Sequence, residues 1–266
     1  MKKTINFSKY QSSGNDFIIL NGFRERYELF MEQIKFLCER KFGVGADGLI
    51  IVKPAPSSNF KIDYYNSDGK IASMCGNGGL CAASFAFANN IVNTKTFNFS
   101  AADGIHKAKI SRKEGMYLAE ISMSDVSNVY KIEENMYFLN TGSPHIIIFV
   151  DDVINYDVVS NGRIIRNNKN LFPEGTNVNF VERKENYLLI RTYERGVEDE
   201  TLSCGTGAVA SAIVEGYLFS QETKLLREIR TKGGILKASC EKQNNNFTNI
   251  YLEGSPIEVF SGKINP

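Results

Sequence analysis

The sequence has almost no net charge, two histidines and no long apolar run. Lys and Arg number 31 against 30 Asp and Glu in 266 residues, so no electrostatic field favours nucleic acid or an anionic membrane. The longest aliphatic stretch, HIIIFV at 145–150, is far too short to span a bilayer. The start, MKKTINFSKYQSSGNDF, has no apolar run behind its lysines. We therefore expect neither a signal peptide nor a membrane partner.

Cysteine is also scarce, and its spacing excludes two common uses. Five cysteines, with no C-x-x-C pair, form neither a disulfide framework nor a zinc pattern. His106 and His145 form no ligand spacing with the cysteines, so we expect no metal. A reducing cytoplasm is the expected location.

Three of the cysteines have a structural interpretation. Cys38 lies on an apolar face that begins at Phe30, in an expected helix that ends at Gly43. Cys81 falls inside an alanine-rich helix and Cys240 in an expected strand, ILKASCE. We expect all three to be core thiols.

The remaining two cysteines occur in matching motifs. MCGNGGLCAA at 74–83 and SCGTGAVASA at 203–212 each place a cysteine at the start of an Ala-rich helix, and Cys75 and Cys204 are 129 residues apart. The N-terminus of a helix stabilises a thiolate, which makes the sulfur reactive. The following glycines let a ligand approach the backbone. One such motif could be a capping turn with a buried cysteine, but two copies favour a shared function.

The resemblance between the two regions extends beyond the cysteines. IDYYNSDGKIASMCGNGG runs beside IRTYERGVEDETLSCGTG, with Tyr64 opposite Tyr193 and Asn66 opposite Arg195. Upstream, GADGLIIV falls beside GTNVNFV, and SGNDFIIL beside TGSPHIIIF. A nearly constant offset indicates a duplicated half. We expect two similar α/β domains about a pseudo-twofold axis, with a boundary near 125–130.

Two facing thiols could form a disulfide, hold a metal or transfer protons on opposite faces of one carbon. A redox pair more often lies on one C-x-x-C loop, and a metal would recruit histidines or carboxylates. Epimerisation fits better, because a thiol has a pKa near enough to neutrality to act as base or acid. The helix N-termini would hold a carboxylate beside the reacting carbon.

Seven sequence blocks resemble those of the diaminopimelate epimerase family, in the same order: GNDF, GVGADG, YYNSDG, MCGNGG, GSPH, GTNVNF and YERGVEDETLSCGTGA. The resemblance covers nearly the whole chain. It implies an isomerase that needs no cofactor and interconverts LL- and meso-diaminopimelate, in lysine and peptidoglycan biosynthesis. It also implies a small-molecule substrate and a homodimer.

The resemblance further implies a fold, domain limits and site residues. Each half is a curved, mostly antiparallel sheet around a central Ala-rich helix, 1–127 with the C-terminal strand 257–266 and then 128–256, with the active site in the cleft between them. Cys75 and Cys204 are the implied acid/base pair, supported by His145 and Glu194. The implied substrate-binding residues are Asn15, Asn66, Gly76, Asn77, Asn177, Glu194, Arg195, Gly205 and Thr206.

Three positions depart from the family pattern. Gly48 stands where Gln is common, Ser143 where Asn is usual, and Leu80 where Arg is common. None is one of the two cysteines, so the departures concern substrate contacts and preference. His106 matches no motif, and we expect it at the surface.

Other functions remain open at this stage. A racemase of proline or hydroxyproline type would use the same two thiols, although the Asn and Arg set favours a second polar substrate end. A non-catalytic amino-acid binder would keep the pocket, and a thiol–disulfide protein would keep the cysteines.

Overall fold

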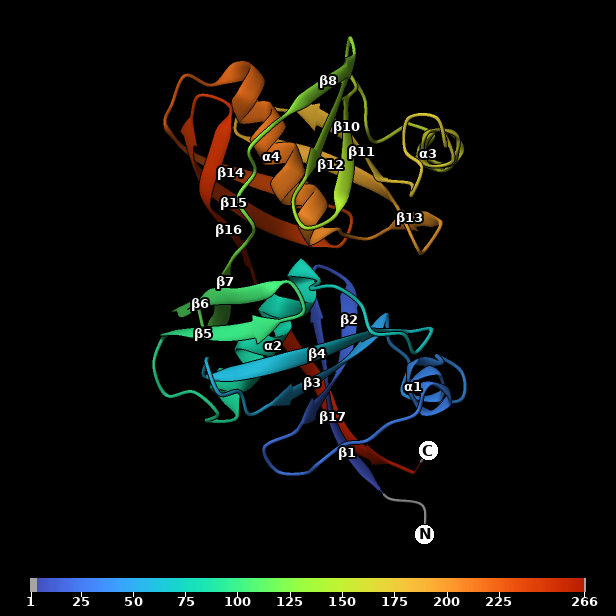
Figure 1. Ribbon diagram of the computed structural model, residues 1–266, viewed down its shortest axis with the longest axis vertical. Coiled ribbons are helices and arrows are strands. Elements are labelled where there is room, and N and C mark those ends of the chain that lie inside the picture. Colours follow the sequence, from blue (N-terminus) through green and yellow to red (C-terminus); the bar gives the residue numbers. More distant parts are fainter. Residues whose placement is uncertain (1–3, 266) are drawn as a thin grey trace. The chain divides into compact units, whose positions relative to one another are not determined.

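The structure is a computed structural model that describes residues 4–265. The chain divides into two compact units (Figure 1). The first runs up to Ile121 and takes in the chain from Gly254 onward, and the second is Ser122–Glu253. Each unit has its own run of paired strands and two helices among the described residues.

The first unit begins with a strand pair and ends with the last strand of the chain. Its elements are β1 (Ile5–Ser12), β2 (Asn15–Asn21), α1 (Met31–Cys38), β3 (Gly48–Lys53), β4 (Phe60–Asn66), α2 (Gly76–Ala88), β5 (Thr96–Ala101), β6 (Gly104–Lys113), β7 (Met116–Ser122) and β17 (Ile257–Ile264).

The second unit is continuous in sequence. Its elements are β8 (Tyr130–Glu133), β9 (Met136–Asn140), β10 (Pro144–Phe149), α3 (Val158–Arg166), β11 (Asn177–Arg183), β12 (Tyr187–Glu194), β13 (Asp199–Thr201), α4 (Gly205–Phe219), β14 (Lys224–Thr231), β15 (Gly234–Gln243) and β16 (Asn246–Gly254).

The two units share one pattern of strand pairing. In the first, β17, β1 and β2 pair antiparallel, β2 and β3 parallel, β3 and β4 antiparallel, β4 and β5 parallel, and β5, β6 and β7 antiparallel. The order β8-β9-β10-β11-β12-β14-β15-β16 repeats these relations, with short β13 also pairing to β12. This identity confirms the duplication inferred from the sequence.

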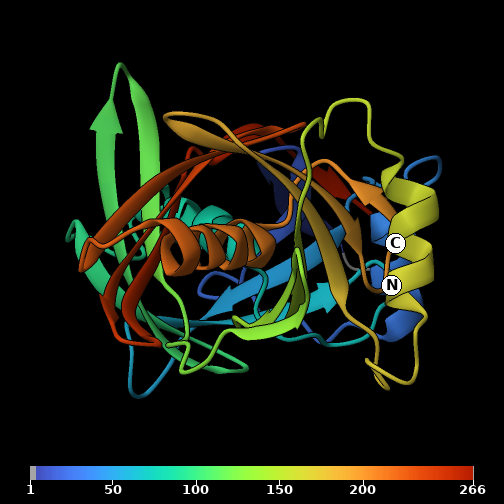
Figure 2. The same ribbon diagram turned by 90° about the horizontal axis from the view of Figure 1, so that it is seen from above.

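The paired strands of each unit curve around one helix, α2 in the first unit and α4 in the second (Figures 1 and 2). Every residue of α2 from Gly76 to Ala86 is buried, and in α4 the stretch from Gly205 to Gly216 is buried except Thr206. Small side chains let the strands approach these helices closely. Because strands surround each helix, no side of it faces water, which explains why neither helix has a polar stripe. None of the helices within residues 4–265 has the length and apolarity needed to cross a membrane.

The other helix of each unit, α1 in the first and α3 in the second, packs on the face of the strands that is opposite the central helix. In the first unit, Ile34, Leu37 and Cys38 of α1 join a core with Ile18 and Leu20 of β2. Strand β2, which carries Ile18 and Leu20, is therefore buried on both faces, which accounts for its nearly continuous apolar sequence.

The helix that we expected to end at Gly43 is shorter in the structure, where it is α1. The placement of Phe30 on its apolar face was wrong. The helix spans Met31–Cys38, and the Phe30 side chain is 74% exposed. Phe30 has extended backbone angles and its N–H donates to Gln33 Oε1 at 3.0 Å, which fixes the helix start one residue later.

Candidate active site

Cys75 is the N-cap of α2, where the extended backbone turns into the helix. Its Sγ lies 3.5 Å from Asn15 Oδ1, the amide oxygen at the start of β2. The thiol is partly exposed, while Gly76 and Asn77 behind it are buried. The first amide N–H groups of a helix have no acceptor within the helix. Together with the helix dipole, they place partial positive charge at the end of α2 that carries the Cys75 sulfur.

Asn15 is held in one orientation by a carboxylate. Its Nδ2 donates to Asp47 Oδ2 at 2.7 Å, which leaves its Oδ1 on the side of Cys75. Arg40 bridges Asp47 at 2.7 Å and Asp16 at 2.8 and 2.9 Å. The Cys75 sulfur is therefore linked through the Asn15 amide to a hydrogen-bonded group of charged side chains.

Asp16 remains ionised within this group. Burial alone would raise the pKa of Asp16, but hydrogen bonds from Arg40 and Lys9 outweigh it and lower the pKa to about 2. Lys9, which is buried, lies 2.8 Å from Asp16 and also donates to the Gly45 carbonyl. The sequence interpretation missed Asp16, Asp47 and Arg40, although both aspartates lie inside the GNDF and GADG blocks.

Asn66 and Gly48 pair with each other across β4 and β3. A Cβ at Gly48 would lie 2.5 Å from Cε2 of the Tyr64 ring and 2.7 Å from the Tyr65 carbonyl oxygen. The ring of Tyr64 thus fills the space that a side chain at position 48 would need. The departure at Gly48 is a packing feature of this chain as well as a missing side chain.

Cys204 is the corresponding N-cap, at the start of α4. It is more buried than Cys75, and its Sγ lies 3.4 Å from Thr206 Oγ1. That hydroxyl lies 2.9 Å from Nε2 of His145 and 3.3 Å from Ser143 Oγ. Ser143, the second departure from the family pattern, therefore hydrogen-bonds within the same polar group as Cys204.

His145 is a neutral ring. It is fully buried at the start of β10, and burial together with the positive charge of Arg195 lowers its pKa to about 3. Near neutral pH it has one N–H and one acceptor nitrogen, and a proton on the wrong nitrogen would disturb its neighbours.

Asn177, Glu194 and Arg195 come together at the ends of β11 and β12. Asn177 Oδ1 accepts the backbone N–H of Arg195 at 2.9 Å, and its Nδ2 donates to the Pro144 carbonyl at 3.1 Å. Glu194 accepts a hydrogen bond from Thr201 Oγ1 at 2.7 Å. The second unit therefore groups six of the implied site residues with Cys204: His145, Asn177, Glu194, Arg195, Gly205 and Thr206.

The other three cysteines are unreactive by their surroundings. Burial raises the pKa of Cys38 to about 12 and of Cys240 to about 11, and it raises the pKa of Cys81 as well. All three are buried free thiols, as the sequence predicted. Among residues 4–265, His, Cys, Asp and Glu side chains form no group of three that could hold a metal ion.

The expectation of a surface His106 is wrong. His106 is 5% exposed, stacks on Phe99 with ring centroids 5.2 Å apart, and its Nε2 lies 3.0 Å from Asp103 Oδ1. Strand β6 alternates buried and exposed residues, and His106 falls on the inward face with Ala108 and Ile110.

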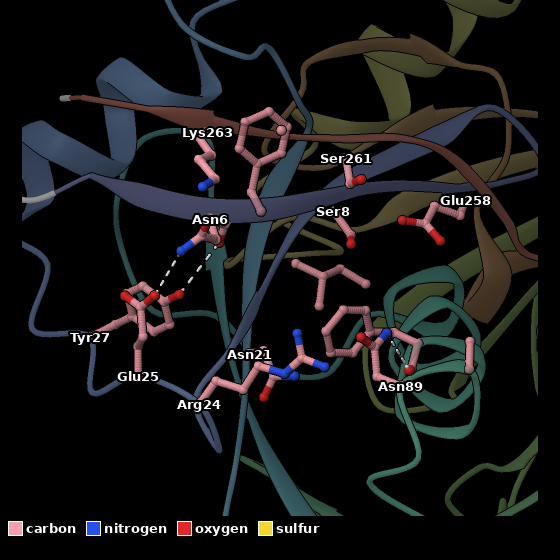
Figure 3. A pocket seen from close by; sticks show the side chains of 15 residues that line it. Asn6, Ser8, Asn21, Arg24, Glu25, Tyr27, Asn89, Glu258, Ser261 and Lys263 are labelled. Carbon is pink, nitrogen blue, oxygen red and sulfur yellow. Dashed lines mark hydrogen bonds between the residues drawn. The ribbon is translucent and has the colours of Figure 1, made fainter.

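The first unit contains a cavity of about 550 Å³, and Figure 3 shows the side chains that line it. Strands β1, β2 and β17 line it together with Phe85, Ala88 and Asn89. These residues are at the C-terminal end of α2, about 15–20 Å along the helix from its N-cap. The cavity is therefore distinct from the surroundings of the thiol.

Comparison with known proteins agrees with this arrangement. The family model described as diaminopimelate epimerase matches residues 7–128 and 137–259. A diaminopimelate epimerase of Flavobacterium psychrophilum is 44% identical over 261 residues, which cover 96% of this chain and 98% of the relative.

Solved structures share the fold at low sequence identity. A phenazine biosynthesis protein of the PhzF family from Bacillus anthracis has a TM-score of 0.76 at 14% identity, over 98% of this chain and 99% of that one. A probable proline racemase from Agrobacterium radiobacter also has a TM-score of 0.76, at 13% identity over 98% of this chain and 92% of that one. The sequence matches, which span nearly the full length, place the chain in the diaminopimelate epimerase family.

Proposed function

We propose that this protein is a cofactor-independent diaminopimelate epimerase that interconverts LL- and meso-2,6-diaminopimelate. The observation that carries the proposal is a near-full-length family match in a chain whose two repeats each begin their central helix with a cysteine. Diaminopimelate is the substrate of the named relatives, and its α-carbons carry the proton that such an enzyme must exchange.

Cys75 and Cys204 are the proposed acid/base pair. The thiolate of one removes the α-proton and becomes a thiol, leaving the electron pair delocalised into the substrate carboxylate. The thiol of the other then gives its proton to the opposite face of the same carbon and becomes the thiolate. One proton leaves the substrate and one enters, and the reverse reaction uses the cysteines in exchanged roles.

The helix N-termini supply the proposed carboxylate site. Backbone amides of Gly76, Asn77, Gly205 and Thr206 would donate to the α-carboxylate at the reacting centre, where negative charge develops. Such amides are preorganised, so they need not reorient as the charge grows.

The remaining polar residues are proposed to bind the distal amino-acid end. Amides, a carboxylate and a guanidinium are available for a second ammonium and carboxylate, on Asn15, Asn66, Asn177, Glu194 and Arg195. Arg195 suits the distal carboxylate because its planar group can bind two oxygens together.

Location and assembly are finer parts of the proposal. Two-thiol chemistry needs reduced sulfur, so we propose a reducing cytoplasm. We also propose a homodimer, which light scattering would report as twice the 29.8 kDa chain mass.

The test is isotope exchange with the purified protein. LL-diaminopimelate in deuterated water should give meso product that carries deuterium at one α-carbon. Cys75→Ala and Cys204→Ala should each lower turnover by at least about 100-fold, the usual contribution of a proton-transfer group. Near-normal turnover in either single variant would exclude the two-base mechanism.

Proline racemase activity is the second candidate, favoured only by the shared fold. Comparing turnover on diaminopimelate and proline separates the two, since proline has no second polar end for Arg195. Measurable binding of diaminopimelate without any deuterium exchange would instead indicate a non-catalytic binder.

A further inference from the structure

The ring of His145 has a defined proton position. Its Nδ1 lies 3.1 Å from Asn179 Nδ2, and the same Nδ2 donates to the Ile146 carbonyl at 3.0 Å. A carbonyl oxygen can only accept, so the group facing both atoms must be the amide NH₂. Thr192 Oγ1, 2.9 Å from Asn179 Oδ1, holds the other side of the amide. Nδ1 is therefore the acceptor, and the single proton of the neutral ring is on Nε2.

The Nε2 proton has consequences for the hydroxyl beside Cys204. Nε2–H faces Thr206 Oγ1 at 2.9 Å, with Ser143 Oγ at 3.0 Å. A Thr206 oxygen that accepts from Nε2 keeps its own proton for another acceptor. Cys204 Sγ, 3.4 Å away, is in reach of that proton.

The first repeat lacks this arrangement. In β2 and β3, Phe17 pairs with Gly48 as His145 pairs with Asn177 in β10 and β11, so Ile50 holds the place of Asn179. A Cβ on Gly78 of α2 would lie 3.3 Å from the Ile50 methyl, whereas one on Gly207 of α4 would lie 2.3 Å from Asn179 Oδ1. Phe17 and Ile50 thus lie under α2 at the positions where the polar pair, His145 and Asn179, lies under α4.

We propose that Asn179 is a positioning residue that holds His145 as its Nε2–H tautomer, so that the Thr206 hydroxyl donates to the sulfur of Cys204. Asn179 acts through two other side chains, with no contact to substrate required. The inference rests on the proposed catalytic role of Cys204. It makes Cys204 dependent on a hydrogen-bonded histidine.

The tautomer can be measured directly, because the chain has two histidines. Long-range ¹H–¹⁵N spectra of protein labelled with ¹⁵N-histidine should show two rings, assigned with His106→Gln. We expect His145 to be neutral with the proton on Nε2 throughout pH 5–9. A proton on Nδ1 in the unmodified protein would overturn the proposal, whatever the enzyme's activity.

Asn179→Leu tests the effect on the thiol. It should let His145 populate the Nδ1–H tautomer and move the midpoint of Cys204 alkylation by iodoacetamide to higher pH, with the Cys75 midpoint unchanged. Each thiol is followed by mass spectrometry of its own peptide. The kcat should fall about 10-fold with little change in KM, since a hydrogen bond to a charged group is lost.

Variants of Thr206 complete the test even if Asn179→Leu does not fold. Thr206→Val should reproduce the alkylation shift and the loss of kcat, and Thr206→Ser, which keeps the hydroxyl, should restore most of both. Ser211→Ala is the matched control, because it removes a buried hydroxyl that bonds Gly207 in the same helix. Equal shifts in Ser211→Ala and Thr206→Val would overturn the inference. The Cys204→Ala result tests the proposed function separately.

Discussion

The two cysteines that begin α2 and α4 have different polar neighbours. Cys75 lies beside the amide oxygen of Asn15, which can only accept a hydrogen bond from the S–H group. Cys204 lies beside a hydroxyl, Thr206, which can donate to a thiolate. A two-base reaction needs one thiol and one thiolate in each direction, and these neighbours suit the two forms differently.

The buried His145 makes stability depend on pH in a calculable direction. Its pKa is lowered from 6.5 to about 3, so the unfolded chain takes up a proton below pH 6.5 that the folded protein does not bind. Stability from this residue is fully present above pH 6.5 and is lost as the pH falls toward 3, by about 1.4 kcal/mol per pH unit. Between pH 7 and 5 the free energy of unfolding should fall by about 2 kcal/mol on this account.

Urea denaturation of wild type and His145→Gln at pH 7 and 5 measures this effect. The variant should lose the His145 part of the pH dependence. Asp16, with a pKa of about 2, keeps its charge over this range and does not contribute. If the free energy of unfolding fell by the same amount between pH 7 and pH 5 in both proteins, His145 would not be neutral in the folded protein.

Individual residues differed in how well the sequence predicted them. Cys75 and Cys204 were identifiable because a rare side chain recurs in a repeated motif. Arg40 and Asn179 were not, because their importance comes from contacts to Asp16 and His145 that exist only after folding. The second Asn of GTNVNF is two residues after Asn177, on the same strand face, and this period was the available signal for it.

At the scale of elements, equivalent glycines of α2 and α4 have unequal room. A methyl group on Gly207 would lie 2.3 Å from Asn179 Oδ1, while one on Gly78 would lie 3.3 Å from the movable end of Ile50. Close packing of helix against strand is therefore tighter where the strand carries the polar pair.

Gly207→Ala and Gly78→Ala form a matched pair of variants. Gly207→Ala should lower the free energy of unfolding by about 1–3 kcal/mol, the cost of overpacking a core, and should displace Asn179 and reduce kcat. Gly78→Ala should have the smaller effect, because alanine also favours the helix and Ile50 can adjust. Thermal denaturation and turnover of both proteins check this, and a larger loss in Gly78→Ala would contradict it.

Element type was easier to predict than element limits. Ala-rich segments after each cysteine are helices, α2 and α4, because small side chains permit burial on every face. The limits of α1 were wrong at both ends, since Gln33 capping and the extended Glu39 define them, and these are local backbone choices.

At the scale of the whole chain, the two repeats differ in how one strand is supplied. The second repeat begins with β8, which pairs with β9. The first repeat obtains the equivalent strand from the far end of the chain, since β17 pairs with β1 from Ile5 to Gln11. The duplicated motifs predicted two similar halves, and the family resemblance implied that the strand 257–266 joins the first of them. The order of strands in a sheet follows from long-range pairing that no local pattern encodes.

Removal of β17 should therefore weaken the first unit selectively. A chain that ends at Ser255 leaves the outer edge of β1 unpaired, and the free energy of unfolding of that unit should fall by several kcal/mol as the ladder is lost. Hydrogen exchange should become faster in β1 and β2 and stay unchanged in β9–β12. The control is Ile257→Ser with Val259→Ser, because both side chains are about half exposed and the backbone pairing is kept. Equal acceleration in β9–β12 would show that the units do not unfold independently, and equal acceleration in the control would show that side chains rather than the ladder hold β1.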